Sequence, residues 1–191
     1  MSRVKGKLVL FYSSNSIFSN FYPAKFTDVD FMLKLPQSSE FFGEKEYQFS
    51  HVEQYMHAYK ALIFKDISTL DQILSTSNPK LTKQLGRKVA NFDDSVWTKI
   101  ALDIVTRGIY LKFDQNDEMW QHMRIVGTGR QFVECSKMDR RWGIGRDIKD
   151  PKCLDPTQWQ GQNWLGLCLD RALKYLNKGT TPNLVIKCIQ F

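Results

Sequence analysis

The sequence lacks a long hydrophobic run, which argues against a membrane-spanning protein. The apolar run near its start covers only residues 8–12, whereas a transmembrane helix needs about 20 consecutive apolar residues. This run is also too short for the apolar region of a secretory signal, which takes about 7–15 residues. We therefore expect no membrane partner and a cytoplasmic protein, or a nuclear one in a eukaryotic cell.

Closely spaced cysteines are missing as well. The four cysteines are Cys135, Cys153, Cys168 and Cys188, and no two lie within the two to four residues that separate paired zinc ligands. Their spacing also indicates no disulfide framework in a chain of this length. We interpret all four as reduced thiols, in agreement with a cytosolic protein.

Several catalytic and cofactor motifs are absent. The chain has no Walker-type phosphate loop, no G-x-S-x-G nucleophile elbow and no H-E-x-x-H motif, since His51 and His57 are six residues apart. Gly143 and Gly145 lack the third glycine of a dinucleotide fingerprint. These absences disfavour metal-dependent hydrolysis and serine-triad chemistry, and we expect neither a metal nor a cofactor.

The composition fits one domain with a sizeable core. The chain has 191 residues, 42% of them hydrophobic, with no repeats and no flexible linker, so we predict a single domain over residues 1–191. Its 27 basic and 20 acidic residues give a net charge of +7. A basic balance favours anionic partners such as nucleic acid or phosphorylated metabolites, and no obligate protein partner is evident.

Hydrophobic periodicity predicts more helix than strand. Five helices are expected to begin near residues 50, 79, 94, 116 and 163, and four short strands are expected over 7–12, 28–35, 131–135 and 184–189. Asn78 followed by Pro79, and Asp93 or Asp94, provide helix-capping signals. Residues 136–160 lack periodicity and are predicted to form an ordered functional loop. The predicted class is α+β, a single helix-rich domain with a few short strands.

The segment from Ser50 to Ala61 carries the most informative polar residues. Ser50 and Glu53 match a capping box, and Glu53 and Lys60 are seven residues apart, which is almost two helical turns. His57 lies between them, and all three flank the apolar stripe, where a helix can line a cleft. Each of these residues also has a structural explanation that needs no substrate. Glu53 can cap the helix, and Lys60 can lay its aliphatic stem on the edge of the core with its ammonium in solvent. His57 can be an ordinary residue on the helix face.

A second group of candidate residues lies in or near the predicted loop. It combines acids, an aromatic ring and glycines: Gly129, Glu134, Ser136, Asp139, Trp142 and Gly143. Arg140, Arg141 and Arg146 add positive charge beside Trp142, and phosphate contact is one interpretation of them. By contrast, we interpret Lys80, Lys83 and Arg87 as the solvated face of a helix.

Taken together, these motifs resemble the NADAR, or YbiA-like, superfamily. The matching segments share their order and spacing with that family and are Ser19–Pro23, Phe49–Ala61, Asn91–Asp93 with Trp97, Lys112–Phe113 with Gln115–Asn116, Thr128–Gly129, Glu134–Gly145, and Gly161–Gly166 with Arg171. The resemblance covers about residues 11–176. It implies a compact, helix-rich α+β fold and an N-glycosidase activity.

The resemblance implies two substrate classes. One is ADP-ribosylated guanine in nucleic acid, and the other is a phosphorylated ribosylamino-pyrimidine of riboflavin biosynthesis. It also implies a lysine that attacks the anomeric carbon and forms a Schiff base, at the position of Lys60. A lysine nucleophile must be neutral, so its pKa should be lowered towards about 7–8. The basic charge favours the nucleic-acid substrate.

The resemblance also suggests roles for other residues. Glu53 would shuttle a proton or stabilise positive charge, Asp139 would orient a ribose hydroxyl or a water, and Trp142 would stack on a base or sugar. The remaining candidates are expected to bind substrate: Asn20, Tyr22, His57, Trp97, Gly129, Glu134, Ser136, Gly143 and Arg146.

Two interpretations without catalysis remain open. In the first, the protein is a module that binds ADP-ribose or NAD, and Glu53 and Lys60 are a cap and a ligand contact. In the second, it is a plain nucleic-acid binder that uses its basic residues. Binding without product would favour the first, and tight binding to unmodified strands would favour the second.

Overall fold

Helices provide most of the structure. The computed structural model describes residues 2–29 and 47–184. Within them the helices are α1 (Val52–Ile63), α2 (Ile67–Leu74), α3 (Pro79–Gly86), α4 (Asp94–Asp114), α5 (Asp117–Gly127) and α6 (Trp164–Lys178). The strands are β1 (Ser2–Lys5), β2 (Leu8–Phe11), β3 (Phe26–Asp28), β4 (Tyr47–Phe49) and β5 (Gln131–Glu134). The predicted helix-rich α+β class is therefore confirmed.

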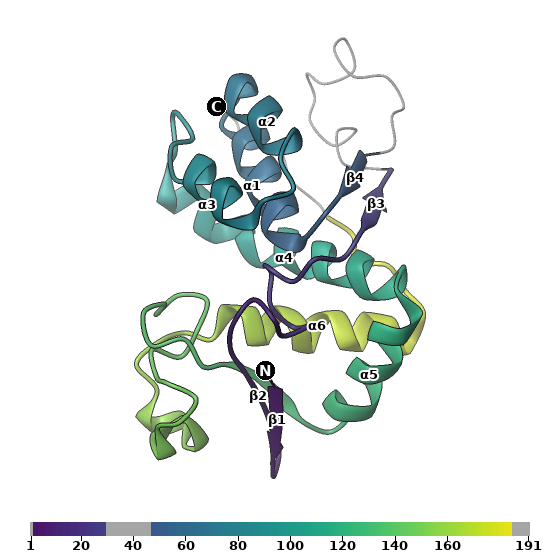
Figure 1. Ribbon diagram of the computed structural model, residues 1–191, viewed down its shortest axis with the longest axis vertical. Helices are drawn as coiled ribbons and strands as arrows, with labels where there is room; N and C mark the ends of the chain where they lie inside the picture. Colours follow the sequence, from purple (N-terminus) through teal and green to yellow (C-terminus); the bar gives the residue numbers. More distant parts are fainter. Residues whose placement is uncertain (1, 30–46, 185–191) are drawn as a thin grey trace.

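The strands form two small sheets at different places in the molecule. β2 pairs antiparallel with β1 and parallel with β5, and β3 pairs antiparallel with β4. Figure 1 shows the three-stranded sheet at one end with α5 and α6, while α1, α2 and α3 lie at the other end and α4 runs between. The parallel register places the last residue of β5, Glu134, beside Phe11.

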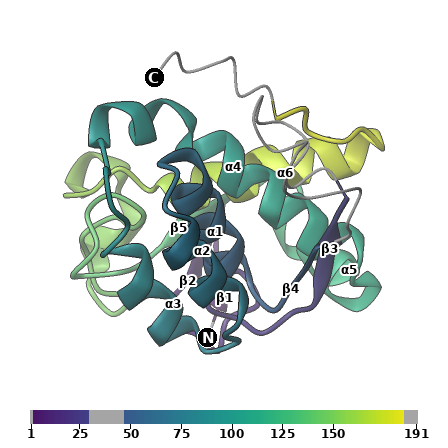
Figure 2. The same cartoon turned by 90° about the horizontal axis from the view of Figure 1, so that it is seen from above.

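Helix α1 is buried on every side. It packs against α2, α3 and α4, and Figure 2 shows it near the middle of the molecule. All twelve of its residues are buried, including Glu53, His57 and Lys60. The sequence predicts one apolar stripe with polar residues at its edges, but the surrounding helices cover those edges too. Charged groups are rarely buried without a partner or a function.

Local capping signals place two helix starts correctly. Asn78 accepts hydrogen bonds from the first backbone N–H groups of α3, and Pro79 is the first helical residue. Asp93 caps α4 in the same way, accepting from the amides of Ser95 and Val96. Because these signals are local, the sequence alone is enough to recognise them.

The capping box predicted from Ser50 and Glu53 is wrong by one residue. The N-cap of α1 is His51, whose Nδ1 accepts from the Gln54 amide at 3.0 Å, while the Gln54 side chain accepts from the Ser50 amide at 2.8 Å. The same reciprocal arrangement thus forms with different residues. As a result, Glu53 has no capping role, and helix capping no longer explains its presence at this position.

Other boundaries differ from the predictions. Helix α3 ends at Gly86 rather than near Val89, and neither β1 nor α2 was expected. The strand predicted over 28–35 lies mostly outside the described residues, and so does the last strand, predicted over 184–189. The predicted loop over 136–160 is irregular, with 3₁₀ turns at Pro151–Leu154 and Pro156–Gln158.

Candidate active site

A cavity of about 170 Å³ lies where the two ends of the molecule meet. Helices α1 and α3, the segment before β3, the end of β5, the loop after it and the start of α6 all contribute residues. The lining consists of Ser19, Asn20, Phe21, Glu53, Met56, His57, Lys83, Arg87, Glu134, Asp139, Trp142 and Leu165. Six candidates from the sequence are therefore brought together here: Asn20, Glu53, His57, Glu134, Asp139 and Trp142.

One wall of the pocket is the first two turns of α1. The Nε2 atom of His57 lies 3.2 Å from Oε1 of Glu53, and both side chains are buried. The Glu53 amide donates to the Asn20 carbonyl at 3.0 Å, which joins α1 to the segment before β3. His57 packs on Gly86, where a Cβ atom would come within 2.0 Å of its ring. Gly86 is therefore required for α3 to approach α1 this closely.

The opposite wall is the loop after β5. Oδ1 of Asp139 accepts from the amides of Arg141 and Trp142, at 3.0 and 2.8 Å, and this turn fixes the loop backbone. The Trp142 ring packs edge-on against Trp164 with a centroid distance of 5.7 Å. Trp142 thus enters the pocket from a rigid support. Its exposed face can stack on a ring of a ligand.

Gly143 serves the packing of this loop. A Cβ atom on it would lie 2.8 Å from Ser136 Cβ and 3.0 Å from the carbonyl oxygens of Glu134 and Asp139. Only a residue without a side chain fits in that space. Gly143 and Ser136 therefore lie behind the pocket wall and do not line it.

The carboxylates of the pocket influence one another. Burial is the largest cause that raises the pKa of Glu134, and with the nearby charges of Asp139 and Glu53, against the opposite effect of Lys83, the pKa reaches about 8. A carboxyl group with this pKa is protonated at neutral pH and can donate a hydrogen bond or a proton. The pocket therefore combines a neutral acid with ionisable carboxylates.

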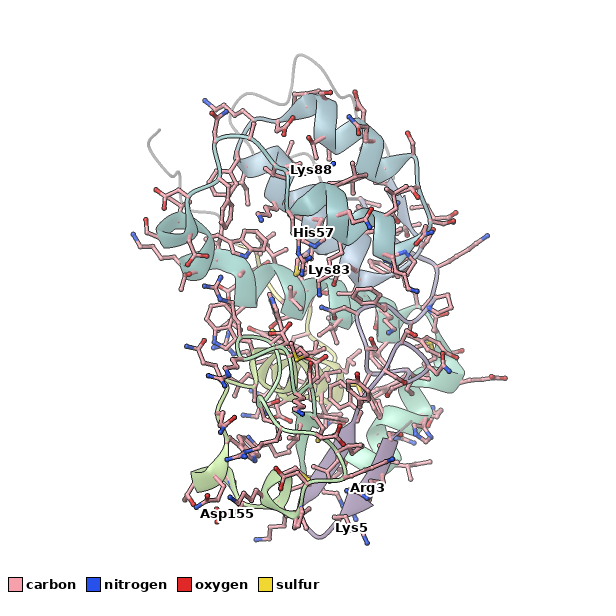
Figure 3. All side chains as sticks on the ribbon, turned by 60° about the vertical axis from the view of Figure 1, so that its left-hand side comes forward. Arg3, Lys5, His57, Lys83, Lys88 and Asp155 are labelled. Atoms are coloured by element: carbon pink, nitrogen blue, oxygen red, sulfur yellow. The ribbon has the colours of Figure 1, made fainter. Side chains whose placement is uncertain are left out.

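Two cations that line the pocket were not recognised from the sequence. Lys83 lies in the last turn of α3 and Arg87 is the C-cap residue of this helix, and Lys83 stands 5.4 Å from the centre of the Phe21 ring. Figure 3 shows Lys83 beside His57 in the middle of the molecule. The four-residue spacing of Lys83 and Arg87 is the sequence signal that places both on one side of the chain. This spacing fits a solvated helix face, which we predicted, as well as it fits a pocket wall. Arg87 is exposed, as the prediction of a solvated face expects, and Lys83 is half-buried, but the sequence did not indicate that both face the pocket.

Two of the three arginines for which phosphate contact was one interpretation bind protein groups instead. Arg141 makes a two-pronged ion pair with Asp94, at 2.7 and 2.9 Å. Arg146 donates to the Gln158 carbonyl at 2.9 Å and lies 3.5 Å from Asp150. Neither side chain lines the pocket.

Lys60 lies on the same helix as Glu53, Met56 and His57 but is not part of the pocket lining. It follows Met56 by four residues and Glu53 by seven, so these side chains project from α1 in similar directions. Its ammonium donates to the Gly86 carbonyl at 2.9 Å and stands 3.7 Å above the centre of the Phe92 ring. Burial lowers the pKa of Lys60 to about 8, while Asp94 raises it and Arg141 lowers it. A substantial neutral fraction is therefore present near physiological pH.

The remaining candidates lie away from the pocket. Trp97 is buried in the main core. Tyr22 lies beside the buried ammonium of Lys112, 5.3 Å from the ring centre. Gly129 adopts a positive φ of 73° in the turn between α5 and β5. Among the described residues, no group of three or more His, Cys, Asp or Glu is placed to hold a metal ion. No helix in the described ranges is long and apolar enough to cross a membrane.

The fold and the pocket define a class of protein. It is a helix-rich α+β domain whose pocket presents carboxylates on two walls and cations on a third, an arrangement suited to acid–base chemistry on an anionic ligand. The chain belongs to the NADAR domain family, whose profile matches residues 10–177. The family resemblance drawn from the sequence is therefore confirmed.

Relatives and a solved structure agree with this assignment. The chain is 38% identical over 173 residues to the protein irg-1 of Caenorhabditis elegans, covering 88% of this chain and 79% of the relative. It is 35% identical over 170 residues to the N-glycosidase R617 of Acanthamoeba polyphaga mimivirus, covering 85% and 92%. The NMR structure of the E. coli protein YbiA matches with a TM-score of 0.66 and 19% identity, covering 93% of this chain and 89% of that one, and shows the same fold.

Proposed function

We propose that this protein is an N-glycosidase that removes ADP-ribose from ADP-ribosylated guanine in nucleic acid, through a Schiff base on Lys60. The observation that carries this proposal is the pairing of a buried, easily neutralised lysine with a pocket rich in carboxyl groups. The name of the viral relative, an N-glycosidase at 35% identity, supports the reaction class.

The size and charge of the pocket support the proposal that the substrate is ADP-ribosylated guanine. A cavity of about 170 Å³ is smaller than the roughly 300–1,000 Å³ typical of drug-sized ligands, so it suits the ribosyl centre of a larger molecule. Lys83 and the exposed Arg87 line the same cavity. In this proposal they would contact the diphosphate of ADP-ribose, and the nucleic acid would lie outside. Trp142 would stack on the ribose or the base.

Lys60 would act after a small movement of its side chain. The ammonium must leave the Gly86 carbonyl and turn towards Met56 and Glu53, which lie on the same face of α1. The neutral amine then attacks C1′ of the ribose as the bond to nitrogen breaks, and ring opening gives the Schiff base that water hydrolyses. Glu53, held by His57, would accept the proton that the attacking amine loses.

Trapping the intermediate tests this mechanism. Borohydride is added during turnover of an ADP-ribosylated guanosine oligonucleotide, and the intact mass of the protein is measured. The wild type is expected to gain the mass of one ADP-ribosyl unit. Lys60→Met, which fills the same space beside Phe92, should show no adduct and at least a thousandfold slower turnover, in the range typical of lost nucleophiles.

A control variant makes the result specific. Lys99→Ala removes an exposed lysine of α4 and should keep both the adduct and the turnover. Full activity of a folded Lys60→Met protein would rule out the lysine mechanism. Base release without any adduct would point to direct attack of water activated by Glu53.

The small cavity also supports the second substrate class. A phosphorylated ribosylamino-pyrimidine places a ribosyl unit, a base and one phosphate within a smaller molecule, and Lys83 could bind that phosphate. Faster turnover of this amine than of the oligonucleotide would assign it as the substrate. Binding of ADP-ribose without any product from either substrate would instead indicate a binding module.

A further inference from the structure

Glu134 is held at the pocket by an unusually complete set of backbone contacts. Its amide donates to Oδ1 of Asn163 at 3.0 Å, and its carbonyl accepts from the amides of Ser136 and Ile144. Asn163 completes the arrangement by donating to the Phe132 carbonyl at 2.9 Å. The main chain at the end of β5 is thus fixed from both sides, and the Glu134 side chain enters the pocket from a rigid position.

One oxygen of the half-buried Glu134 carboxyl lacks such support. Its Oε2 atom is buried and has no hydrogen-bond partner among the described residues. Two other buried acids are partnered, since Asp28 accepts from Arg107 and Glu53 lies against His57. An ionised carboxylate left buried without a partner costs several kcal/mol, whereas the neutral acid is tolerated.

The charged groups around Glu134 favour the protonated form. Glu53 and His57 face the pocket from α1. Lys83 faces it from α3, Arg87 from the C-cap of α3, and Asp139 from the loop after β5. The two acids act to keep the proton on Glu134, and burial acts in the same direction. Lys83 opposes them without overcoming their effect. Glu134 therefore presents a carboxylic acid proton inside the cavity where a ribosyl bond would be cleaved.

We propose that Glu134 is the catalytic acid that protonates the departing nitrogen of the base. This inference rests on the proposed function, and it adds a role for a residue that the sequence suggested only as a substrate contact. The electron pair of the C1′–N bond moves to the nitrogen, and the Glu134 proton joins it. The base leaves neutral and Glu134 becomes a carboxylate. When water later adds to the Schiff base, the carboxylate takes up one of its protons and is restored.

A pair of substrates that differ in their need for a proton tests the role. The guanine of an ADP-ribosylated oligonucleotide needs protonation to leave, whereas 4-nitrophenol leaves readily as an anion from 4-nitrophenyl ADP-ribose. Glu134→Gln should slow the first reaction by about 100- to 1,000-fold, as expected for a lost general acid, and the second by less than about tenfold. Glu118→Gln, an exposed change on α5, should affect neither reaction.

The pH profile on the oligonucleotide gives an independent measurement. In the wild type, kcat/KM should fall above pH about 8 as Glu134 loses its proton, and this alkaline limb should disappear in Glu134→Gln. Equal losses on both substrates, or an unchanged alkaline limb, would overturn the acid role and leave Glu134 as a binding residue. Inactivity of the wild type on both substrates would instead refute the proposed function. Circular dichroism of each variant verifies that it is folded.

Discussion

Two buried clusters of charged side chains lie in this protein, and they differ in how completely their hydrogen bonds are made. The first joins β3, α1 and α4: Asp28 accepts from Arg107 at 2.7 and 3.1 Å and from the Tyr55 hydroxyl at 2.7 Å. Arg107 also donates to the Pro182 carbonyl at 3.1 Å. The second is the pocket, where Asn20, His57 and Glu134 each have a buried polar atom without a partner in the described chain.

The difference indicates what each cluster does. A fully bonded cluster has nothing left to offer a ligand, so the Asp28 cluster fixes elements that are distant in sequence. Buried atoms without partners are uncommon in native proteins and need an explanation such as a missing ligand. In the pocket, Oδ1 of Asn20 and Oε2 of Glu134 are groups that a substrate would satisfy, whereas Nδ1 of His57 packs on Gly86. The same core therefore contains one polar cluster that stabilises the fold. The second cluster lowers the stability of the fold but leaves polar atoms available to a substrate.

Removing one partner of the Asp28 cluster should have the largest effect on stability. Arg107→Leu leaves Asp28 buried and unpaired, and we expect a loss of about 3–5 kcal/mol in the free energy of unfolding. Urea denaturation measures it. The double variant Asp28→Leu, Arg107→Leu should recover much of the loss because no charge stays buried. A loss below about 1 kcal/mol for Arg107→Leu would show that the cluster does not stabilise the fold.

Replacing Glu134 in the pocket should increase the free energy of unfolding, whereas Arg107→Leu should decrease it. The pKa of Glu134 is raised to about 8 in the folded protein, so the folded state holds a proton that the unfolded state releases near pH 4.5. The stability contributed by this group is present below pH 4.5 and is lost as the pH rises towards 8. Glu134→Gln keeps a neutral side chain at every pH. It should therefore match the wild type near pH 4.5 and exceed it by up to about 4 kcal/mol at pH 8, since one pKa unit corresponds to about 1.4 kcal/mol.

Thermal and urea unfolding at both pH values measure this difference. The exposed variant Glu118→Gln retains Glu134 and should follow the wild type at both pH values. A Glu134→Gln protein that is less stable than the wild type at pH 8 would mean that the carboxylate has a stabilising partner, which contradicts the comparison between the two clusters.

Local signals made much of the fold predictable from the sequence. Asn78 with Pro79, and Asp93, cap their helices through bonds to residues two or three positions away, so the pattern contains all that is needed. The capping box of α1 was misassigned because two overlapping sets of residues fit it. Only the position of the His51 side chain distinguishes them. Burial on every side of α1 depends on α2, α3 and α4, and no pattern within α1 reveals it.

The candidate site was only partly predictable for the same reason. The family resemblance pointed to Glu53, Asp139 and Trp142, and the fold brings them to one cavity. Phosphate contact was one interpretation of Arg141, but this side chain forms an ion pair with Asp94, which lies 47 residues away in the sequence. Lys83 is near the pocket because α3 packs on α1 at Gly86. Pairings between distant segments decide which charges remain available, and the sequence does not show them.

The smallest expected effect is on substrate binding by Lys83. It tests whether the pocket, whose polar groups are incompletely bonded, binds a substrate phosphate. If Lys83 contacts a substrate phosphate, Lys83→Ala should raise KM for the ADP-ribosylated oligonucleotide about tenfold, which corresponds to about 1.4 kcal/mol, with little change in kcat. The slope of log(kcat/KM) against log salt should become shallower by about 1, since one phosphate contact is lost. Lys80→Ala provides the matched control, because Lys80 is exposed on the same helix and does not line the cavity. Equal effects of the two variants would assign the salt dependence to the overall basic charge, and a selective effect of Lys83→Ala would place the substrate phosphate at the α3 wall.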